Sequence, residues 1–235
     1  MEQKKTIGIT GANGALGKAL IRRFKQDGYN IIGFSHKKSN EDSPNDQPNK
    51  WIYWKCGEEV SLKKALEEID ILILNHGIYE ANIRNQNFEK TIEINSISKL
   101  RIIELFEDIV FNQKNLPFAK EIWVNTSEAE LFPALSPSYE VSKSLIGQII
   151  SFKKNLYSKS ERKKLIIRKI VLGPFKSELN PIGIMNANYV AWLICFISKF
   201  NIRLIIISIN PFTYLFFPLK ELYYFCYSLV LKIIQ

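Results

Sequence analysis

The 235 residues are enough to bury a hydrophobic core, and 46% hydrophobic with 23% charged residues is typical of a globular chain and not of a disordered one. The net charge of +9 admits an anionic partner such as nucleic acid, a phosphorylated cofactor or anionic lipid. No dense basic run is interleaved with aromatic residues, and the basic clusters at 153–154 and 162–164 stand in polar surroundings. We therefore expect no nucleic-acid partner.

The few cysteines and histidines narrow the chemistry further. Cys56, Cys195 and Cys226 are widely spaced, and the first residues lack the apolar stretch of a signal peptide, so the sequence predicts a reduced, cytoplasmic protein. The two histidines, His36 and His76, form no CxxC or HxxxH pattern. We expect no metal site.

Apolar runs alternate with amphipathic stretches in the first part of the chain. The predicted strands are residues 5–10, 29–35, 51–56 and 70–77, and the predicted helices are residues 17–28 and 61–69. Residues 36–50 contain no aliphatic, aromatic or cysteine side chain, so a mobile surface loop is expected there. The run at 70–77 is apolar on both faces of the strand, which indicates a buried parallel strand.

The same alternation continues to about residue 208. The predicted helices are residues 87–113 and 137–157, and the predicted strands are residues 119–127, 163–173 and 203–208. Alternating strands and helices favour an α/β fold with a parallel sheet. The sequence thus predicts one domain over residues 1–235, a three-layer sandwich with a Rossmann-like, doubly wound parallel sheet of about seven strands.

The C-terminal segment at about 189–235 has a different composition, with only five charged residues. As a helix, residues 218–235 place Lys220, Tyr224, Ser228 and Lys232 on one narrow stripe, with apolar side chains nearly everywhere else. Burial against the sheet or a second subunit is the favoured interpretation, so a homo-oligomer is expected. Contact with a membrane surface is the alternative, and a spanning helix is disfavoured because no apolar run reaches about 18–20 residues.

The segment TGANGALG, residues 10–17, joins the first predicted strand to the first predicted helix. Three glycines there allow a tight turn, close approach of a pyrophosphate and close packing of helix on strand. The helix N-terminus would supply N–H groups and a favourable dipole. The predicted cofactor contacts in this turn are Gly11, Asn13, Gly14, Ala15, Leu16 and Gly17.

The second predicted strand ends in Ser35, His36 and Lys37, followed by Lys38. An NAD-binding unit commonly has Asp or Glu at this point, and an acid would repel a 2′-phosphate. Hydroxyl and cationic groups have the opposite effect. The sequence therefore favours NADP(H) over NAD(H), with Ser35, His36 and Lys37 as cofactor contacts.

Candidate catalytic residues follow in the segment YEVSK. Tyr139 and Lys143 are four residues apart, so they share one face of a helix. A lysine ammonium beside a phenol favours the phenolate, which can exchange a proton with an alcohol or a carbonyl. Ser127 ends the predicted strand 119–127, at the edge of the sheet where ligands bind in such folds, and its hydroxyl could hydrogen-bond a substrate oxygen.

These motifs, taken in order, resemble the short-chain dehydrogenase/reductase family. Residues 10–17 match the form TGxxGxxG, and Asn75, His76 and Gly77 resemble the NAG element after the fourth strand. Ser127, Tyr139 and Lys143 fall on the family's Ser and YxxxK positions, and Asn95 on that of a helical asparagine. The resemblance covers nearly the whole chain.

The resemblance implies a role for each matching residue. Tyr139 would be the general acid or base, and Lys143 would activate it and hold the nicotinamide ribose. Ser127 would orient the reacting oxygen, and Asn95 would hold a helical kink and a proton-relay water. The cofactor contacts implied in the second half of the site are Asn75, His76, Gly77, Tyr139, Lys143 and Pro174.

The chain also departs from the family pattern. The glycine spacing and the pair Gly173-Pro174, where shorter members show PG, are similar to the extended branch. His76 occupies a position where the family usually has alanine, and Cys56-Gly57 one where an aspartate often contacts the adenine. Glu128 after Ser127 is also unusual for the family. The substrate lid falls at 175–190, where the residues that could line a pocket, or simply pack, are Phe175, Leu179, Ile182, Ile184 and Met185.

The leading hypothesis is an NADP-preferring oxidoreductase that interconverts an alcohol and a carbonyl of a small molecule, which the apolar C-terminal segment suggests is lipophilic. One alternative is a non-catalytic dinucleotide-binding scaffold or sensor that docks a membrane or a partner. Another is a nucleotide-sugar epimerase or dehydratase, which the length disfavours because such enzymes carry a larger C-terminal substrate region.

Overall fold

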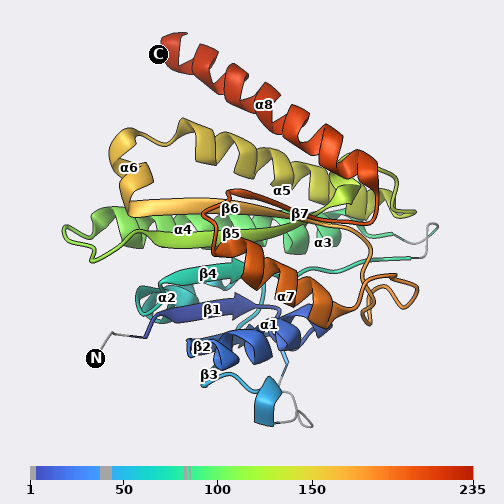
Figure 1. Cartoon of the computed structure of the whole chain (residues 1–235), viewed down its shortest axis with the longest axis horizontal. Coiled ribbons are helices and arrows are strands. Elements are labelled where there is room, and N and C mark those ends of the chain that lie inside the picture. The colour runs from blue at the N-terminus through green and yellow to red at the C-terminus, as the bar shows by residue number, and fades with distance from the viewer. Residues whose placement is uncertain (1–3, 38–43, 82–83, 85, 235) are drawn as a thin grey trace.

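Seven parallel strands form one sheet at the centre of the molecule (Figure 1). The computed structural model describes residues 4–37, 44–81, 84 and 86–234. The strands are β1 (Thr6–Thr10), β2 (Asn30–Ser35), β3 (Lys50–Tyr53), β4 (Ile71–Leu74), β5 (Lys120–Ser127), β6 (Leu165–Leu172) and β7 (Leu204–Ile207). Their spatial order is β3-β2-β1-β4-β5-β6-β7, with the reversal between β1 and β4. This confirms the predicted Rossmann-like fold.

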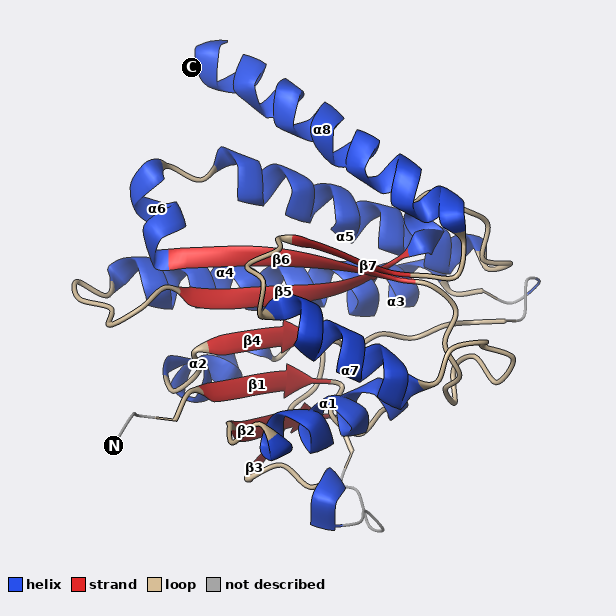
Figure 2. Ribbon diagram, in the orientation of Figure 1, coloured by secondary structure: helices blue, strands red, loops and turns tan. Residues whose placement is uncertain are grey.

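Helices cover both faces of the sheet (Figure 2). They are α1 (Ala15–Gln26), α2 (Lys63–Glu67), α3 (Phe88–Ile92), α4 (Ser98–Asn112), α5 (Pro137–Leu156), α6 (Lys159–Lys164), α7 (Ala187–Ser198) and α8 (Pro211–Ile234). One core lies between the sheet and α1 with α7, and the other lies between the sheet and α2, α4 and α5. All four residues of β4 are buried, as expected for a strand covered on both faces.

The predicted helix over 87–113 is interrupted by a π-turn, η4 (Glu93–Ile97), between α3 and α4. Asn95 lies in this turn and is fully buried. Such turns are frequent at functional sites because they redirect side chains within a helix. Asn95 therefore lies at an irregular turn of the helix, which is where the resemblance implies a kink.

Two stretches between the main elements differ in detail from the prediction. The described residues of the polar stretch 36–50 form a connection from β2 to β3 that contains the short 3₁₀ turn Pro44–Asp46, where Arg22 on α1 pairs with Asp46 at 2.6 Å, and Lys50 already belongs to β3. Residues 38–43 lie outside the described ranges. The basic cluster near 162 belongs to a short helix, α6, which the sequence did not predict. A capping box between Ser158 and Glu161 starts this helix.

Of the two covers expected for the C-terminal helix, the sheet is not the one that the structure shows, and cover by a second subunit stays a prediction. Helix α8 starts at Pro211, seven residues before the predicted start, with Pro218 inside it, and it packs mainly on α5. Its buried residues are Thr213, Phe217, Glu221 and Ser228. Of the predicted polar stripe, Ser228 is buried, Lys220 and Tyr224 are half-buried and Lys232 is exposed. Among the described residues, no helix combines the length and apolar character needed to cross a bilayer.

Candidate active site

The glycine turn between β1 and α1 has the shape of an anion cradle. Gly11 has φ +64°, and the N–H of Gly14 donates to the Gly11 carbonyl at 3.1 Å. A Cβ on Gly17 would lie 2.3 Å from the Gly11 oxygen, so only glycine fits. Among the described residues no side chain caps α1 at Gly14, and its first turn has no acid. The free N–H groups therefore suit a dinucleotide pyrophosphate.

The end of β2 is tied to this turn by a small polar network. Asn13 Nδ2 donates to Ser35 Oγ and to the Lys37 carbonyl, both at 2.7 Å, and the Lys37 N–H donates to Ser35 Oγ at 3.2 Å. The Ser35 hydroxyl also donates to the Lys37 carbonyl, so it is already used within the loop. The side chains of His36 and Lys37 are exposed beside it, whereas Lys38 lies outside the described residues. A 2′-phosphate at this point would meet the exposed side chains of His36 and Lys37 and not the Ser35 hydroxyl.

Thr10 joins the ends of β1 and β4. Its Oγ1 accepts the N–H groups of Asn75 at 2.9 Å and His76 at 3.3 Å, and lies 2.8 Å from His76 Nδ1. The Oγ1 hydrogen can be donated to Nδ1 or to the Ile73 carbonyl, 3.3 Å away, so the ring proton lies on Nε2 in the first case and on Nδ1 in the second. Among the described residues Nε2 has no hydrogen-bond partner.

His76 is also held in an electropositive and apolar environment. Its ring packs edge-on against Trp54, with 5.4 Å between ring centroids. Burial, followed by the charges of Lys99 and Lys143, holds the pKa of His76 well below its ordinary value, so the ring is neutral. The buried Nε2 of this neutral ring is suited to hydrogen-bond a ligand hydroxyl, which can both donate and accept. Together with the glycine cradle, this ring nitrogen without a partner among the described residues makes the site compatible with a bound dinucleotide.

Asn95 connects the segment after β4 to helix α5. Its Oδ1 accepts the Ile78 N–H at 2.8 Å, and its Nδ2 donates to the Ile78 carbonyl at 3.0 Å and to Ser142 Oγ at 2.9 Å. A Cβ on Gly77 would lie 2.9 Å from Asn95 Oδ1 and 3.9 Å from Lys143 Nζ. Asn95, Gly77 and Lys143 are thus brought together.

Helix α5 presents the predicted tyrosine and lysine from its first two turns. Lys143 is buried, and its Nζ lies 5.3 Å from the centroid of the Tyr139 ring. The ring of Tyr79 packs edge-on against Tyr139 at 5.3 Å and helps to fix it. Ser127 ends β5; its Oγ accepts the Ala129 N–H at 3.2 Å, which leaves the hydroxyl hydrogen available for donation.

Lys99 is a residue of this region that the sequence analysis missed. It is fully buried on α4, and its Nζ donates to the Asn125 carbonyl at 3.1 Å. Burial, together with the neighbouring Lys143 ammonium, holds the pKa of Lys99 well below its ordinary value. The sequence feature that could have pointed to Lys99 is its position four residues after Asn95, which places both residues on one face of a helix.

The lid after β6 divides the predicted pocket residues into two groups. Pro174 accepts the N–H groups of Ile184 and Met185 at 3.1 and 3.3 Å, so the segment folds back on itself. Phe175 and Met185 pack in the core next to α7. The exposed side chains are Leu179, Ile182 and Ile184. Packing therefore accounts for the first pair, and only the exposed group is free to meet a ligand.

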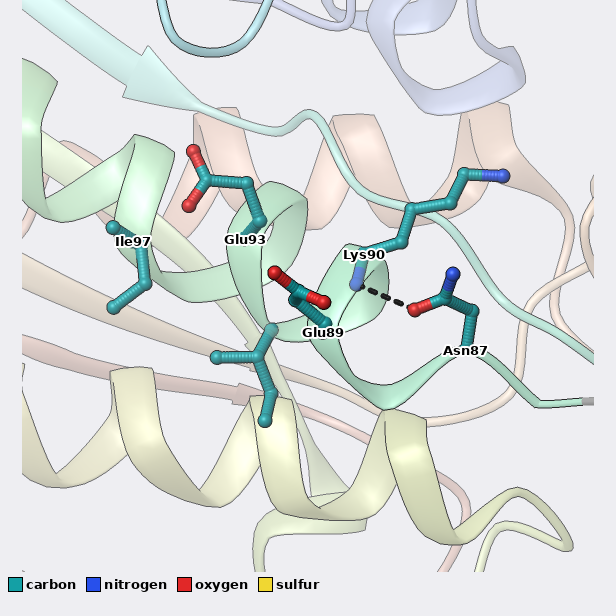
Figure 3. A pocket seen from close by; sticks show the side chains of 6 residues that line it. Asn87, Glu89, Lys90, Glu93 and Ile97 are labelled. Carbon is teal, nitrogen blue, oxygen red and sulfur yellow. Dashed lines mark hydrogen bonds between the residues drawn. The ribbon is translucent and has the colours of Figure 1, made fainter.

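A surface hollow of about 580 Å³ lies on α3 and η4 (Figure 3). It is lined by Asn87, Glu89, Lys90, Ile92, Glu93 and Ile97. None of the predicted site residues takes part. Its open form and its two carboxylates are typical of a solvated helix surface, so we assign it no role.

Comparison with known proteins agrees with this geometry. The sequence profile described as the NAD dependent epimerase/dehydratase family matches residues 7–138. A curated relative from Synechocystis, a "Monoglucosyldiacylglycerol epimerase", is 40% identical over 232 residues, which are 95% of this chain and 55% of the relative. The chain thus spans about half the length of that relative.

Solved structures show the same fold at low identity. The ligand-free aldohexose dehydrogenase of Thermoplasma acidophilum superposes with a TM-score of 0.71 at 14% identity, over 88% of this chain and 93% of its own. A short chain dehydrogenase from Burkholderia cenocepacia in complex with NADP gives 0.72 at 14%, over 87% and 88%. The chain belongs to the NAD dependent epimerase/dehydratase family, an NAD(P)-binding enzyme family within the short-chain dehydrogenase/reductase superfamily.

Proposed function

We propose that this chain is an epimerase that inverts a secondary alcohol on the sugar headgroup of a glycolipid. The observation that carries the proposal is the placement of Tyr139, Lys143 and Ser127 at one edge of the sheet, next to a glycine turn that suits a dinucleotide. The 40% identical relative bears the name of a glycolipid epimerase, which suggests the substrate class. Exposed apolar side chains on the lid are in keeping with a lipophilic substrate.

The side chains of the site divide the proton chemistry among them. Tyr139 as the phenolate takes the proton of the substrate hydroxyl, and returns it when the carbonyl is reduced. The positive charge of Lys143, 5.3 Å from the ring centroid, stabilises the phenolate. Ser127 donates a hydrogen bond to the reacting oxygen and keeps it in place.

The cofactor would be held by residues of the cradle and of the strand ends. The Gly11–Gly17 turn would bind the pyrophosphate, and His76 Nε2 and Lys143 would bind ribose hydroxyls. Bound NAD(P) supplies hydride transfer, the one chemistry that these side chains do not provide. Exposed His36 and Lys37 favour the 2′-phosphate of NADP(H), so we expect NADP(H) to bind more tightly than NAD(H).

A second candidate is a net oxidoreductase that interconverts an alcohol and a carbonyl. It is suggested by the printed names of structures that share the fold, an aldohexose dehydrogenase and a short chain dehydrogenase in complex with NADP. The two functions differ in cofactor balance. An epimerase returns the hydride to the opposite face of the same carbon and consumes no cofactor overall, whereas an oxidoreductase changes the amount of NAD(P)H with each turnover.

The decisive experiment uses the 235-residue chain with monoglucosyldiacylglycerol in detergent micelles, with NADP or NAD. We expect an epimeric glycolipid, detected by NMR, without net formation of NADPH. Tyr139→Phe should abolish turnover and leave cofactor affinity within a few-fold, because the phenol exchanges the proton and the cradle remains intact.

Three results would separate the alternatives. Stoichiometric NADPH would favour the oxidoreductase. Cofactor binding without turnover on glycolipids, ketones, aldehydes or alcohols would favour a scaffold or sensor. Normal turnover by Tyr139→Phe would contradict the mechanism itself.

A further inference from the structure

Helix α8 presents its apolar side to the outside of the molecule. It runs along α5 on the outer side of the protein (Figure 1), and the residues that face inward are largely polar. Apolar side chains that are about half exposed or more occur along its length, among them Leu215, Leu219, Leu222, Tyr223, Val230 and Ile233. A contiguous apolar surface of this kind marks an interaction site.

A buried ion cluster prevents α8 from turning this surface inward. Lys169 Nζ on β6 donates to Glu130 Oε2 at 2.8 Å and to Glu221 Oε1 at 2.9 Å, and all three side chains are buried. Lys220 adds a second ion pair to Glu130 at 2.9 Å, and Lys154 pairs with Glu221. Rotation of the helix would separate these charges in the protein interior, which is costly. The apolar face is therefore fixed outward.

Basic residues lie next to the C-terminal end of this face. Lys232 Nζ donates to the Asn155 carbonyl at 2.7 Å, which places the end of α8 beside the last turn of α5, a helix that ends three residues before α6 begins. Lys159 and Lys163 on α6 are exposed. An apolar surface with cations at its edge complements a bilayer, which offers hydrocarbon below a layer of anionic headgroups.

The other end of α8 is connected to the candidate active site. Glu128, the residue after Ser127, accepts hydrogen bonds from Ser208 Oγ at 2.6 Å and from Thr213 Oγ1 at 3.3 Å. The ring of Phe132 contacts that of Phe216, with 6.2 Å between centroids. The start of α8 thus packs on the segment that leads from Ser127 to Tyr139.

From these contacts we infer that α8 docks in the plane of an anionic bilayer. Its apolar face enters the boundary between headgroups and acyl chains, and Lys159 and Lys163 meet the anionic headgroups. The inference deepens the proposed function, because a diacylglycerol lipid stays in the bilayer and its headgroup has to be reached there. A second copy of the chain is a weaker candidate, since it would bring cations of the same sign to the contact.

The experiment measures binding of the 235-residue chain to vesicles that contain no glycolipid. Vesicles of phosphatidylcholine with an equal part of phosphatidylglycerol are compared with pure phosphatidylcholine by co-sedimentation. We expect stronger binding to the anionic vesicles, and Leu219→Glu/Leu222→Glu should weaken it by about tenfold or more because two charges would enter the apolar boundary. Lys159→Glu/Lys163→Glu should remove most of the preference for anionic vesicles.

The control is Val60→Glu, which places a single Glu at an exposed apolar position outside α8. It should bind like the unaltered chain. The inference would be overturned if the unaltered chain did not bind vesicles. It would also be overturned if Leu219→Glu/Leu222→Glu bound them as strongly as Val60→Glu. A dimer that Leu219→Glu/Leu222→Glu dissociates, with no vesicle binding, would assign the face to a second copy.

Turnover of micellar substrate separates this inference from the proposed function. The Leu219→Glu/Leu222→Glu variant should keep turnover in micelles while losing it on vesicles. Vesicle binding without turnover would contradict the proposed function alone, and turnover without vesicle binding would contradict only the docking inference.

Discussion

Replacement of Lys169 by methionine should show how strongly the buried ion cluster holds α8. Burial alone would lower the pKa of Lys169, but Glu130 and Glu221 outweigh it and raise the pKa above its ordinary value, so the side chain is charged. Its Nζ also donates to the Gly147 carbonyl at 3.1 Å and to Ser151 Oγ at 3.3 Å. Methionine fills a similar volume but replaces none of these bonds.

The expected loss in the free energy of unfolding depends on the ion pairs that Glu130 and Glu221 keep after the substitution. Removal of one partner from a buried ion pair costs about 3–5 kcal/mol. Glu130 would keep Lys220 and Glu221 would keep Lys154, so we expect the lower end, about 3 kcal/mol. With a urea dependence of about 2–3 kcal/mol per M, the unfolding midpoint should fall by about 1–1.5 M.

Urea unfolding followed by circular dichroism measures this loss, with Lys232→Met as the control. Lys232 donates to backbone carbonyls at the surface and takes no part in the cluster, so its replacement should cost less than about 1 kcal/mol. Glu130→Gln added to Lys169→Met should cost less than the sum of the two single changes, because the two residues interact directly. A Lys169→Met loss no larger than that of the control would refute the structural role assigned to the cluster.

Three further predictions concern the cofactor site. Lys37→Glu should weaken binding of NADPH much more than that of NADH in fluorescence titrations, and an unchanged ratio would contradict the NADP preference. Gly17→Ala should lower stability by about 1–3 kcal/mol because its Cβ would meet the Gly11 oxygen, whereas Gly14→Ala, with 3.4 Å to the same oxygen, should cost less than about 1 kcal/mol. The pKa of His76 is lowered in the folded protein, so below about pH 6.5 its ring takes up a proton only when the chain unfolds. The free energy of unfolding should therefore fall by about 1 kcal/mol from pH 7 to 5.5, and His76→Asn should remove this fall. An equal fall in both proteins would exclude His76 as its cause.

The sequence predicted the strands well because a strand that is buried on both faces appears as an apolar run between turn residues. β4 is such a case, with every residue buried. Helix α6 was missed because Lys159–Lys164 has no apolar face, and its start depends on the capping box at Ser158. Pro218 was taken as the start of a helix, whereas the chain is already helical from Pro211.

The catalytic candidates came from residue type, spacing and resemblance, and the fold places them at one edge of the sheet. Their roles stay predictions. Residue spacing could not show that the Ser35 hydroxyl is already hydrogen-bonded within its own loop, because one of its partners is the side chain of Asn13. It also could not show that Lys99 is buried, because that burial depends on a carbonyl acceptor at Asn125 on a different element.

Helix α8 shows why an amphipathic pattern alone does not determine which side of a helix faces the protein. The pattern predicted a stripe with Lys220, Tyr224, Ser228 and Lys232, and the sheet or a second subunit was expected to cover the apolar side. The partners of the stripe are charged residues in elements far away in sequence, Lys169 in the strand β6 and Glu130 in the turn after β5. These two buried charges pair with each other at 2.8 Å, and Lys220 and Glu221 of α8 extend the pair into a cluster of four charges. A buried ion pair between a strand and a turn can therefore draw the charged residues of a neighbouring helix inward, so that the apolar side of this helix is left exposed.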